Sequence, residues 1–263
     1  MLDVCKRLGI EVDVLAPLRS TNNTVFWLDP TPFVAKVHRS RLSASRELAA
    51  GHALARLNAP IVGPAERVGD EVHDVDDVHV TFWLYAAQGG LDAPTARAVA
   101  MALHELHRCL SGLVDDTSPR SYEEQLRDAI QALNTVGFAP RLWTADRCIL
   151  METLETTLDR MRGAAPVVLH GSPHRMNILA TTDGPVFVDL ETLQLGPIEW
   201  DLAHLEPEVA QHYPNAHDEG LLTVCRMGVS AATSTWCWGA LDRGDDMHEH
   251  AKFHLEVVRS TKA

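Results

Sequence analysis

The sequence predicts an α+β protein of two lobes, a small β-rich N-terminal lobe with one helix and a larger, mainly helical C-terminal lobe. Three observations support this. At 263 residues, the chain can bury two lobes that share a cleft. Up to residue 85 the apolar residues occur in short runs separated by Asn, Asp, Pro and Gly. From residue 86 they recur at three- and four-residue spacing over long stretches. We therefore expect lobes at residues 1–85 and 86–263.

The N-terminal lobe should contain short strands and one helix. The helix is expected from Ser43 to Leu57, because Ala50 and Leu54 lie on the face that also carries Glu47. Either Ser43 or Ser45 is available to cap its N-terminus. The expected strands cover residues 13–19, 24–29, 33–38, 65–69 and 79–84.

The C-terminal lobe should be helical apart from a few short strands. A turn is expected at Thr182-Asp183-Gly184, and helices should resume near Trp200. The remaining expected helices cover residues 95–110, 121–135, 145–162 and 245–258, the strands cover 166–169, 178–180 and 186–188, and a loop covers 214–220.

Charge and cysteine content restrict the class of protein. The chain has 36 acidic and 23 basic residues and a formal net charge of -13, which argues against nucleic acid as a partner. The acidic surface would suit a cationic small molecule, but such surfaces more often serve solubility. Its five cysteines are scattered and include no C-x-x-C pair, so neither a disulfide framework nor a zinc site is expected.

The sequence also indicates a cytoplasmic protein without a membrane partner. We find no run of the roughly 20 apolar residues that a membrane-spanning helix needs. The first residues carry charges, among them Lys6, Arg7 and Glu11, where a signal peptide needs an apolar stretch.

Candidate metal ligands follow two short strands between residues 167 and 189. Asn177 ends a polar loop, and Asp189 ends the hairpin that comes after it. Amide and carboxylate oxygens at neighbouring strand ends are the hard ligands that Mg²⁺ prefers when it bridges nucleotide phosphates. The sequence therefore predicts a magnesium site at Asn177 and Asp189.

The surrounding motif resembles that of the aminoglycoside phosphotransferase and choline kinase group, which are relatives of protein kinases. The group's catalytic loop reads H-G-D-x-H-x-x-N, and here residues 170–177 read HGSPHRMN. The metal Asp in VDLE, the Gly196-Pro197 pair and the Trp-Asp-Leu-Ala helix start at 200–203 also match. The resemblance implies a bilobal protein-kinase-like fold, with ATP or another nucleoside triphosphate and Mg²⁺ as cofactors.

One position departs from the motif, because Ser172 stands where the group has its catalytic Asp. That Asp orients the substrate hydroxyl and accepts its proton. Ser172 cannot act as a base at neutral pH, but it can form a hydrogen bond with the hydroxyl. His174 is a candidate substitute base, since histidine has an unperturbed pKa of about 6.5. Glu191 is a second candidate base, and a further metal ligand is the more favoured role for it.

The N-terminal lobe carries a second part of the resemblance. A kinase fold needs a lysine on its third strand and a glutamate on the next helix, and Lys36 and Glu47 match these positions. The resemblance implies that the Lys36 ammonium contacts the α- and β-phosphates while Glu47 holds it in place.

Two further nucleotide contacts are expected from the same resemblance. Residues Ser20, Thr21, Asn22 and Asn23 correspond to the phosphate-covering loop, although they include no glycine. Asn tolerates positive φ and could replace glycine there. Backbone groups near Tyr85 and Ala87, where the connector between the lobes is expected, would pair with adenine.

Three functions remain open from the sequence. The first is an active phosphotransferase that moves the γ-phosphoryl group to a hydroxyl of an aminoglycoside-like or other amine-bearing acceptor. The second is a nucleotide-binding pseudokinase with a regulatory role. The third is a metal hydrolase built on His170 and His174, which is disfavoured because Gly171 and Pro173 oppose the helix that such a site needs.

Overall fold

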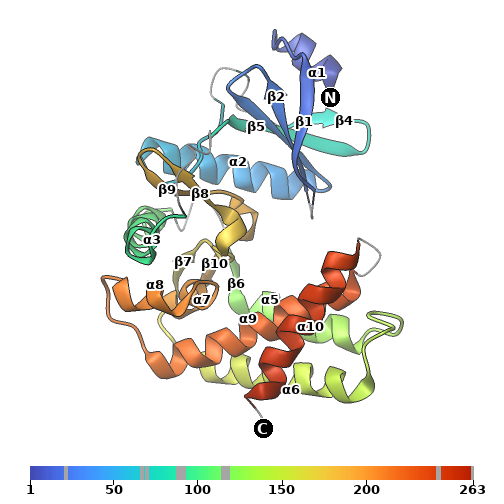
Figure 1. The fold of residues 1–263 in the computed structure, drawn as a ribbon, viewed down its shortest axis with the longest axis vertical. Helices are drawn as coiled ribbons and strands as arrows, with labels where there is room; N and C mark the ends of the chain where they lie inside the picture. Colours follow the sequence, from blue (N-terminus) through green and yellow to red (C-terminus); the bar gives the residue numbers. More distant parts are fainter. Residues whose placement is uncertain are drawn as a thin grey trace. The chain divides into compact units, whose positions relative to one another are not determined.

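The chain divides into two compact units, each assembled from separate segments (Figure 1). The structure is a computed structural model that describes residues 1–20, 23–65, 68, 71–86, 93–113, 119–240 and 244–261. The first unit contains Met1–Ser118, Pro173–Leu193 and Gln211–Pro214, and the second contains Pro119–Ser172, Gln194–Ala210 and Asn215–Ala263. The lobe boundary expected between residues 85 and 86 stays a prediction.

The first unit is built on a five-stranded antiparallel sheet with strand order β1-β2-β3-β5-β4 (Figure 1). The strands are β1 (Val14–Ser20), β2 (Thr24–Asp29), β3 (Phe33–His38), β4 (His73–Val75) and β5 (Val78–Leu84). The predicted strands at 24–29 and 33–38 are confirmed, and those at 13–19 and 79–84 differ by one residue. Of the predicted strand at 65–69 only Ala65 and Val68 are described, and neither lies in a strand.

Helix α2 (Arg41–Arg56) packs against this sheet. It begins two residues before the predicted start, and the prediction of its cap was wrong, because the Oγ of Ser40 accepts the Ser43 N–H at 3.3 Å. Gly51 allows the close approach, since a Cβ there would lie 2.7 Å from the Trp83 ring. The short helix α1 (Leu2–Arg7) was not predicted.

The rest of the first unit comprises a helix and a second hairpin. Helix α3 (Ala96–Leu110) confirms the prediction to within one residue, with Thr95 as its N-cap. Strands β8 (Ile178–Thr181) and β9 (Gly184–Phe187) form the predicted hairpin. The one-turn 3₁₀ segments η1 (Arg175–Asn177) and η2 (Leu190–Thr192) flank it. The Val62 N–H donates to the Phe187 carbonyl at 3.0 Å, which joins the hairpin to the segment after α2.

The second unit is mainly helical. Ser121 and Glu124 form a capping box at the start of α5. The helices after residue 119 are α5 (Tyr122–Asn134), α6 (Thr144–Met161), α7 (Ile198–Ala203), α8 (Pro207–His212), α9 (Glu219–Gly239) and α10 (Asp245–Ser260). A small sheet with order β6-β10-β7 joins Arg120–Ser121, Gln194–Gly196 and Val167–Leu169. Among the described residues, none of the helices has the length and apolar character to span a membrane.

The core of the second unit explains why the long helices were predictable. Leu126, Leu150 and Leu154 are fully buried and recur at helical spacing on α5 and α6. They share one cluster with Trp200 of α7 and Leu255 of α10. The α+β content predicted from the sequence, with a β-rich N-terminal part and a helical C-terminal part, is confirmed.

Candidate functional site

The β8–β9 hairpin brings the two predicted metal ligands together at its open end, opposite the turn that joins the two strands. Asn177 immediately precedes β8 and Asp189 follows β9, and the Val188 N–H donates to the Asn177 carbonyl at 3.0 Å. Asp189 has φ 72° and ψ 63°, a left-handed conformation that is uncommon for non-glycine residues and that Asp tolerates better than most. The amide of Asn177 and the carboxylate of Asp189 are hard oxygen donors and fit a divalent cation such as Mg²⁺.

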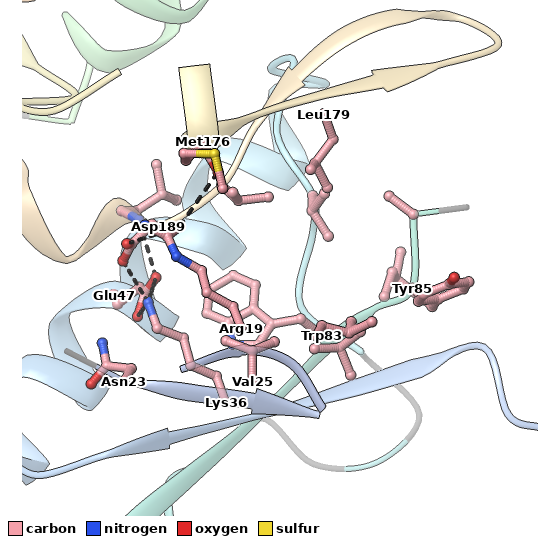
Figure 2. Close-up of a pocket in the computed structure, with 17 residues that line it drawn as sticks. Arg19, Asn23, Val25, Lys36, Glu47, Trp83, Tyr85, Met176, Leu179 and Asp189 are labelled. Carbon is pink, nitrogen blue, oxygen red and sulfur yellow. Dashed lines mark hydrogen bonds and ion pairs between the residues drawn. The ribbon is translucent and has the colours of Figure 1, made fainter. Parts of the chain in front are cut away.

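Lys36 is the centre of a buried ion-pair cluster (Figure 2). Its Nζ lies 2.7 and 2.8 Å from the two carboxylate oxygens of Glu47 and 2.6 Å from Oδ1 of Asp189. Burial by itself lowers the pKa of Lys36, but the negative charges of Glu47 and Asp189 outweigh it, so the pKa of Lys36 is raised. The lysine is therefore charged at neutral pH.

Glu47 connects helix α2 to the segment that follows Asp189. Its Oε1 accepts the Leu190 N–H at 3.0 Å in addition to the Lys36 ammonium. The residue is only 2% exposed. Burial raises the pKa of the Glu47 carboxyl, and the charge of Lys36 opposes this. The structure thus has the Lys36–Glu47 pair that the resemblance implied and adds Asp189 to it.

Arg19, which the sequence did not single out, lies beside Asp189 (Figure 2) and also contacts Asn177. From the end of β1, its Nη1 donates to Oδ1 of Asn177 at 2.6 Å and to the Met176 carbonyl at 3.4 Å, and lies 4.0 Å from Oδ2 of Asp189. A single arginine at a strand end carries no sequence signal for such contacts. Nearby, the Asn23 amide donates to Oε2 of Glu191 at 2.7 Å.

One end of a cavity of about 490 Å³, a volume in the range of small-molecule sites, is lined by Arg19, Asn23, Lys36, Glu47 and Asp189. The rest of its wall is largely apolar and includes Leu18, Val25, Val34, Val62, Trp83, Leu179 and Val188. An apolar wall beside a charged end suits a ligand with a flat apolar base and an anionic tail.

Tyr85 lies at the apolar end of this cavity (Figure 2). Its ring stacks on Trp27, with centroids 4.7 Å apart and an interplanar angle of 14°. Its backbone N–H already donates to the Pro32 carbonyl at 2.8 Å, so a base bound there needs another backbone group. Thr21, Asn22 and Ala87, which were also expected to contact nucleotide, lie outside the described residues, as does the side chain of Ser20.

In the second unit, Asp201 organises the backbone of the His-Gly motif. Its carboxylate, which is fully buried, accepts the His170 N–H at 2.9 Å and the Gly171 N–H at 2.8 Å. Gly171 has φ 87°, which explains glycine at this position. The Trp200 indole N–H donates to the Gly171 carbonyl at 3.3 Å. The Trp-Asp pair of the sequence motif thus supports the backbone directly before Ser172.

Ser172 and His174 follow this supported segment. The Ser172 N–H donates to Nδ1 of His170 at 3.4 Å, a long hydrogen bond, and both residues belong to the second unit. His174 is half-buried and belongs to the first unit. Their roles as replacement for the carboxylate and as substitute base stay predictions.

Comparison with known proteins gives a family and a fold. The profile of the phosphotransferase enzyme family matches residues 14–222. No curated protein matches the sequence at a significant level.

Solved structures match over nearly the whole chain. The structure of APH(2")-IIia in complex with GDP and kanamycin has a TM-score of 0.74 at 12% identity, covering 99% of this chain and 97% of that one. An amicoumacin kinase in complex with AMP-PNP and Ca²⁺ has a TM-score of 0.74 at 13% identity, with coverages of 99% and 93%. A choline/ethanolamine kinase family protein from Mesorhizobium loti has a TM-score of 0.63 at 18% identity, with coverages of 94% and 87%. These similarities confirm the predicted kinase-like fold.

Proposed function

Because this chain belongs to the phosphotransferase enzyme family, we propose that it transfers the γ-phosphoryl group of ATP to a hydroxyl of a small molecule. We propose Mg²⁺ as the metal, an aminoglycoside-like or other amine-bearing compound as the acceptor, and the cytoplasm as the place of action. The observation that carries the proposal is the contact of Lys36 with both Glu47 and Asp189. It sets the cation that we propose to bind phosphate beside the carboxylate that we propose to bind metal.

Five polar side chains in and beside the charged end of the cavity have a role in this proposal. Lys36 would hold the α- and β-phosphates, and Glu47 would keep its ammonium in place. Asn177 and Asp189 would bind Mg²⁺, with Glu191 as a further ligand. The metal would neutralise charge on the β- and γ-phosphates. The apolar wall beside Trp83 would receive the base.

The transfer itself needs one bond to form and one to break. The acceptor oxygen attacks the γ-phosphorus, the bond from that phosphorus to the β-phosphate oxygen breaks, and ADP leaves. The acceptor hydroxyl loses its proton, which His174 in its neutral form would take up. Ser172 would accept or donate a hydrogen bond to the hydroxyl. A general base contributes roughly 10²- to 10⁴-fold, so a chain without the carboxylate would retain slow turnover.

Ser172 also favours a second candidate function, a pseudokinase that binds nucleotide for a regulatory purpose and transfers little or no phosphate. Both functions need the same charged cluster around Lys36. They differ only in whether an acceptor is phosphorylated.

A single assay separates the two candidates. The purified chain is incubated with ATP, Mg²⁺ and a panel of hydroxylated amines, and both ADP release and the mass of each acceptor are measured. We expect ADP release that depends on one acceptor class, with the acceptor gaining one phosphoryl group. Mg²⁺-dependent nucleotide binding without turnover on any acceptor would support the pseudokinase instead. Absence of nucleotide binding would overturn both.

A further inference from the structure

We infer that Arg19 is a resident cation of the metal site, which holds Asn177 and Asp189 until a divalent cation and nucleotide displace it. This inference rests on the proposed function, because it assigns a control on the same site. Its basis is geometric. One guanidinium nitrogen, Nη1, lies 2.6 Å from the Asn177 amide oxygen and 4.0 Å from the Asp189 carboxylate.

The two cations compete for the same oxygen. A Mg²⁺ ion bonded to Oδ1 of Asn177 at about 2.1 Å would lie no more than about 4.7 Å from the Arg19 nitrogen that donates to this oxygen. Charges of the same sign repel strongly at such a separation in a partly buried site. Arg19 therefore has to leave this position, or gain an anionic partner, before the metal binds tightly.

Arg19 is free to make that move. It lies at the end of β1, which is an edge strand of the sheet, and its side chain is 25% exposed. Asn23, which immediately precedes β2, makes a further tie to the metal-binding segment through Glu191. Arg19 and Asn23 thus contact the two segments that flank the β8–β9 hairpin, one before β8 and one after β9.

The triphosphate supplies the partner that Arg19 loses. A guanidinium donates strong, charge-assisted hydrogen bonds to phosphate oxygens. When nucleotide enters beside Lys36, Arg19 can exchange the neutral Asn177 oxygen for a charged phosphate oxygen. Arg19 then opposes the metal in the empty site and stabilises the nucleotide in the filled one.

This double role predicts opposite effects of one substitution. In Arg19→Met, the nucleotide-free protein should bind Mn²⁺ about fivefold more tightly, since a repulsive charge is gone. In the presence of EDTA, the same variant should bind ATP about tenfold more weakly, since a charged hydrogen bond is lost. Electron paramagnetic resonance of free Mn²⁺ gives the first quantity, and isothermal titration calorimetry with ATP gives the second.

Two further variants serve as controls. Arg46 is exposed on α2 next to Glu47, and no described contact joins it to the metal ligands. Arg46→Met therefore removes one positive charge from the same unit and should change neither affinity. Arg19→Lys keeps the charge and should stay close to the wild type in Mn²⁺ affinity. It also shows whether the methionine variant acts through charge rather than through a change of fold.

The outcomes distinguish this inference from the proposed function. If Arg19→Met binds Mn²⁺ no more tightly than the wild type, or if neither protein binds it, the resident-cation role is wrong. The proposed function would survive that result as long as the wild type binds Mg-ATP. If the wild type does not bind ATP with or without metal, the proposed function fails first, and the inference fails with it.

Discussion

The ammonium of Lys36 lies 2.6 Å from Oδ1 of Asp189, while both carboxylate oxygens of Glu47 also accept from it. The residue expected to hold phosphate is thus bound directly to the residue expected to hold metal. One cation thus pairs with two carboxylates from distant segments of the chain. The Glu47–Leu190 hydrogen bond, with a separation of 143 residues, joins the same two segments. The cluster therefore stabilises the first unit as well as preparing its binding site.

Lys36→Met should destabilise the first unit, because among the described residues it leaves the buried Glu47 carboxylate without a counter-charge and Asp189 with only the more distant Arg19, at 4.0 Å. Removing one partner of a buried ion pair costs about 3–5 kcal/mol. Urea unfolding followed by tryptophan fluorescence measures this loss. The exposed pair Lys252–Glu249 offers a matched control, and Lys252→Met should change the free energy of unfolding by less than about 0.5 kcal/mol.

The double variant Lys36→Met/Glu47→Leu tests the cause of that loss. It removes the uncompensated carboxylate together with the lysine, so it should be more stable than Lys36→Met alone. Equal stabilities of the single and double variants would show that Glu47 does not need its partner.

Asp189→Ala should abolish the metal dependence of nucleotide binding. Loss of a carboxylate ligand should lower metal affinity by at least roughly 10- to 100-fold, the range found even for groups that only support a ligand. Calorimetry with ATP, with and without Mg²⁺, measures the ratio of the two dissociation constants. Asp183→Ala, in the exposed turn of the β8–β9 hairpin, is the control and should keep that ratio. Normal Mg-ATP binding by Asp189→Ala would refute the metal assignment.

Ser172→Asp should preserve Mg-ATP binding and raise phosphoryl transfer. A general base contributes about 10²- to 10⁴-fold, which bounds the gain in kcat on an accepted substrate. Ser172→Asn has nearly the same shape without the charge and should bring no such gain. Steady-state ADP release by the three proteins is the measurement, and equal rates for the Asp and Asn variants would argue against a proton-handling role at this position.

His38 should make the protein less stable as the pH falls. Its ring is buried beside the Lys36 charge, and these two causes lower the pKa of His38 to about 3 from an unfolded value of 6.5. The neutral ring is therefore favoured in the folded state. Its contribution to stability is complete above pH 6.5 and is lost as the pH falls from 6.5 towards 3, with a slope of about 1.4 kcal/mol per pH unit.

The His38→Gln variant isolates that contribution. It retains a polar group for the hydrogen bond that His38 shares with Thr81 at 2.9 Å. The other titrating groups contribute equally to both proteins, so their effects cancel in the difference in free energy of unfolding between wild type and variant. Below pH 6.5 the wild type should lose stability relative to the variant. A difference that is constant with pH would mean that the buried ring titrates normally.

The sequence predicted most of the fold because its signals are local. Strands β2 and β3 consist of apolar runs bounded by turn residues, and both were predicted with the correct limits. The predicted start of α2 was wrong because Ser40, Ser43 and Ser45 are all suitable N-cap residues, and only the backbone geometry selects Ser40. Helix α1 and the short strands β4, β6 and β10 are too short for a periodic pattern to emerge.

The parts of the site that sequence motifs mark were predictable. Contacts between residues far apart in the sequence were not, where no motif marks them. The Lys36–Glu47 pair follows from positions 11 residues apart. The Arg19–Asn177 contact joins positions 158 residues apart, and a single arginine leaves no pattern by which to find it. The hydrogen bond from the Tyr85 N–H to the Pro32 carbonyl is likewise a property of the folded backbone, and the identities of the side chains do not predict it.

The support that Asp201 provides has a consequence for substitutions at position 172. Its carboxylate binds the backbone N–H groups of His170 and Gly171, and these bonds are indifferent to the side chain at position 172. Substitution at that position therefore leaves this scaffold of the loop intact. Ser172 can therefore be exchanged for an acid, or for its amide, without rebuilding the backbone that carries it.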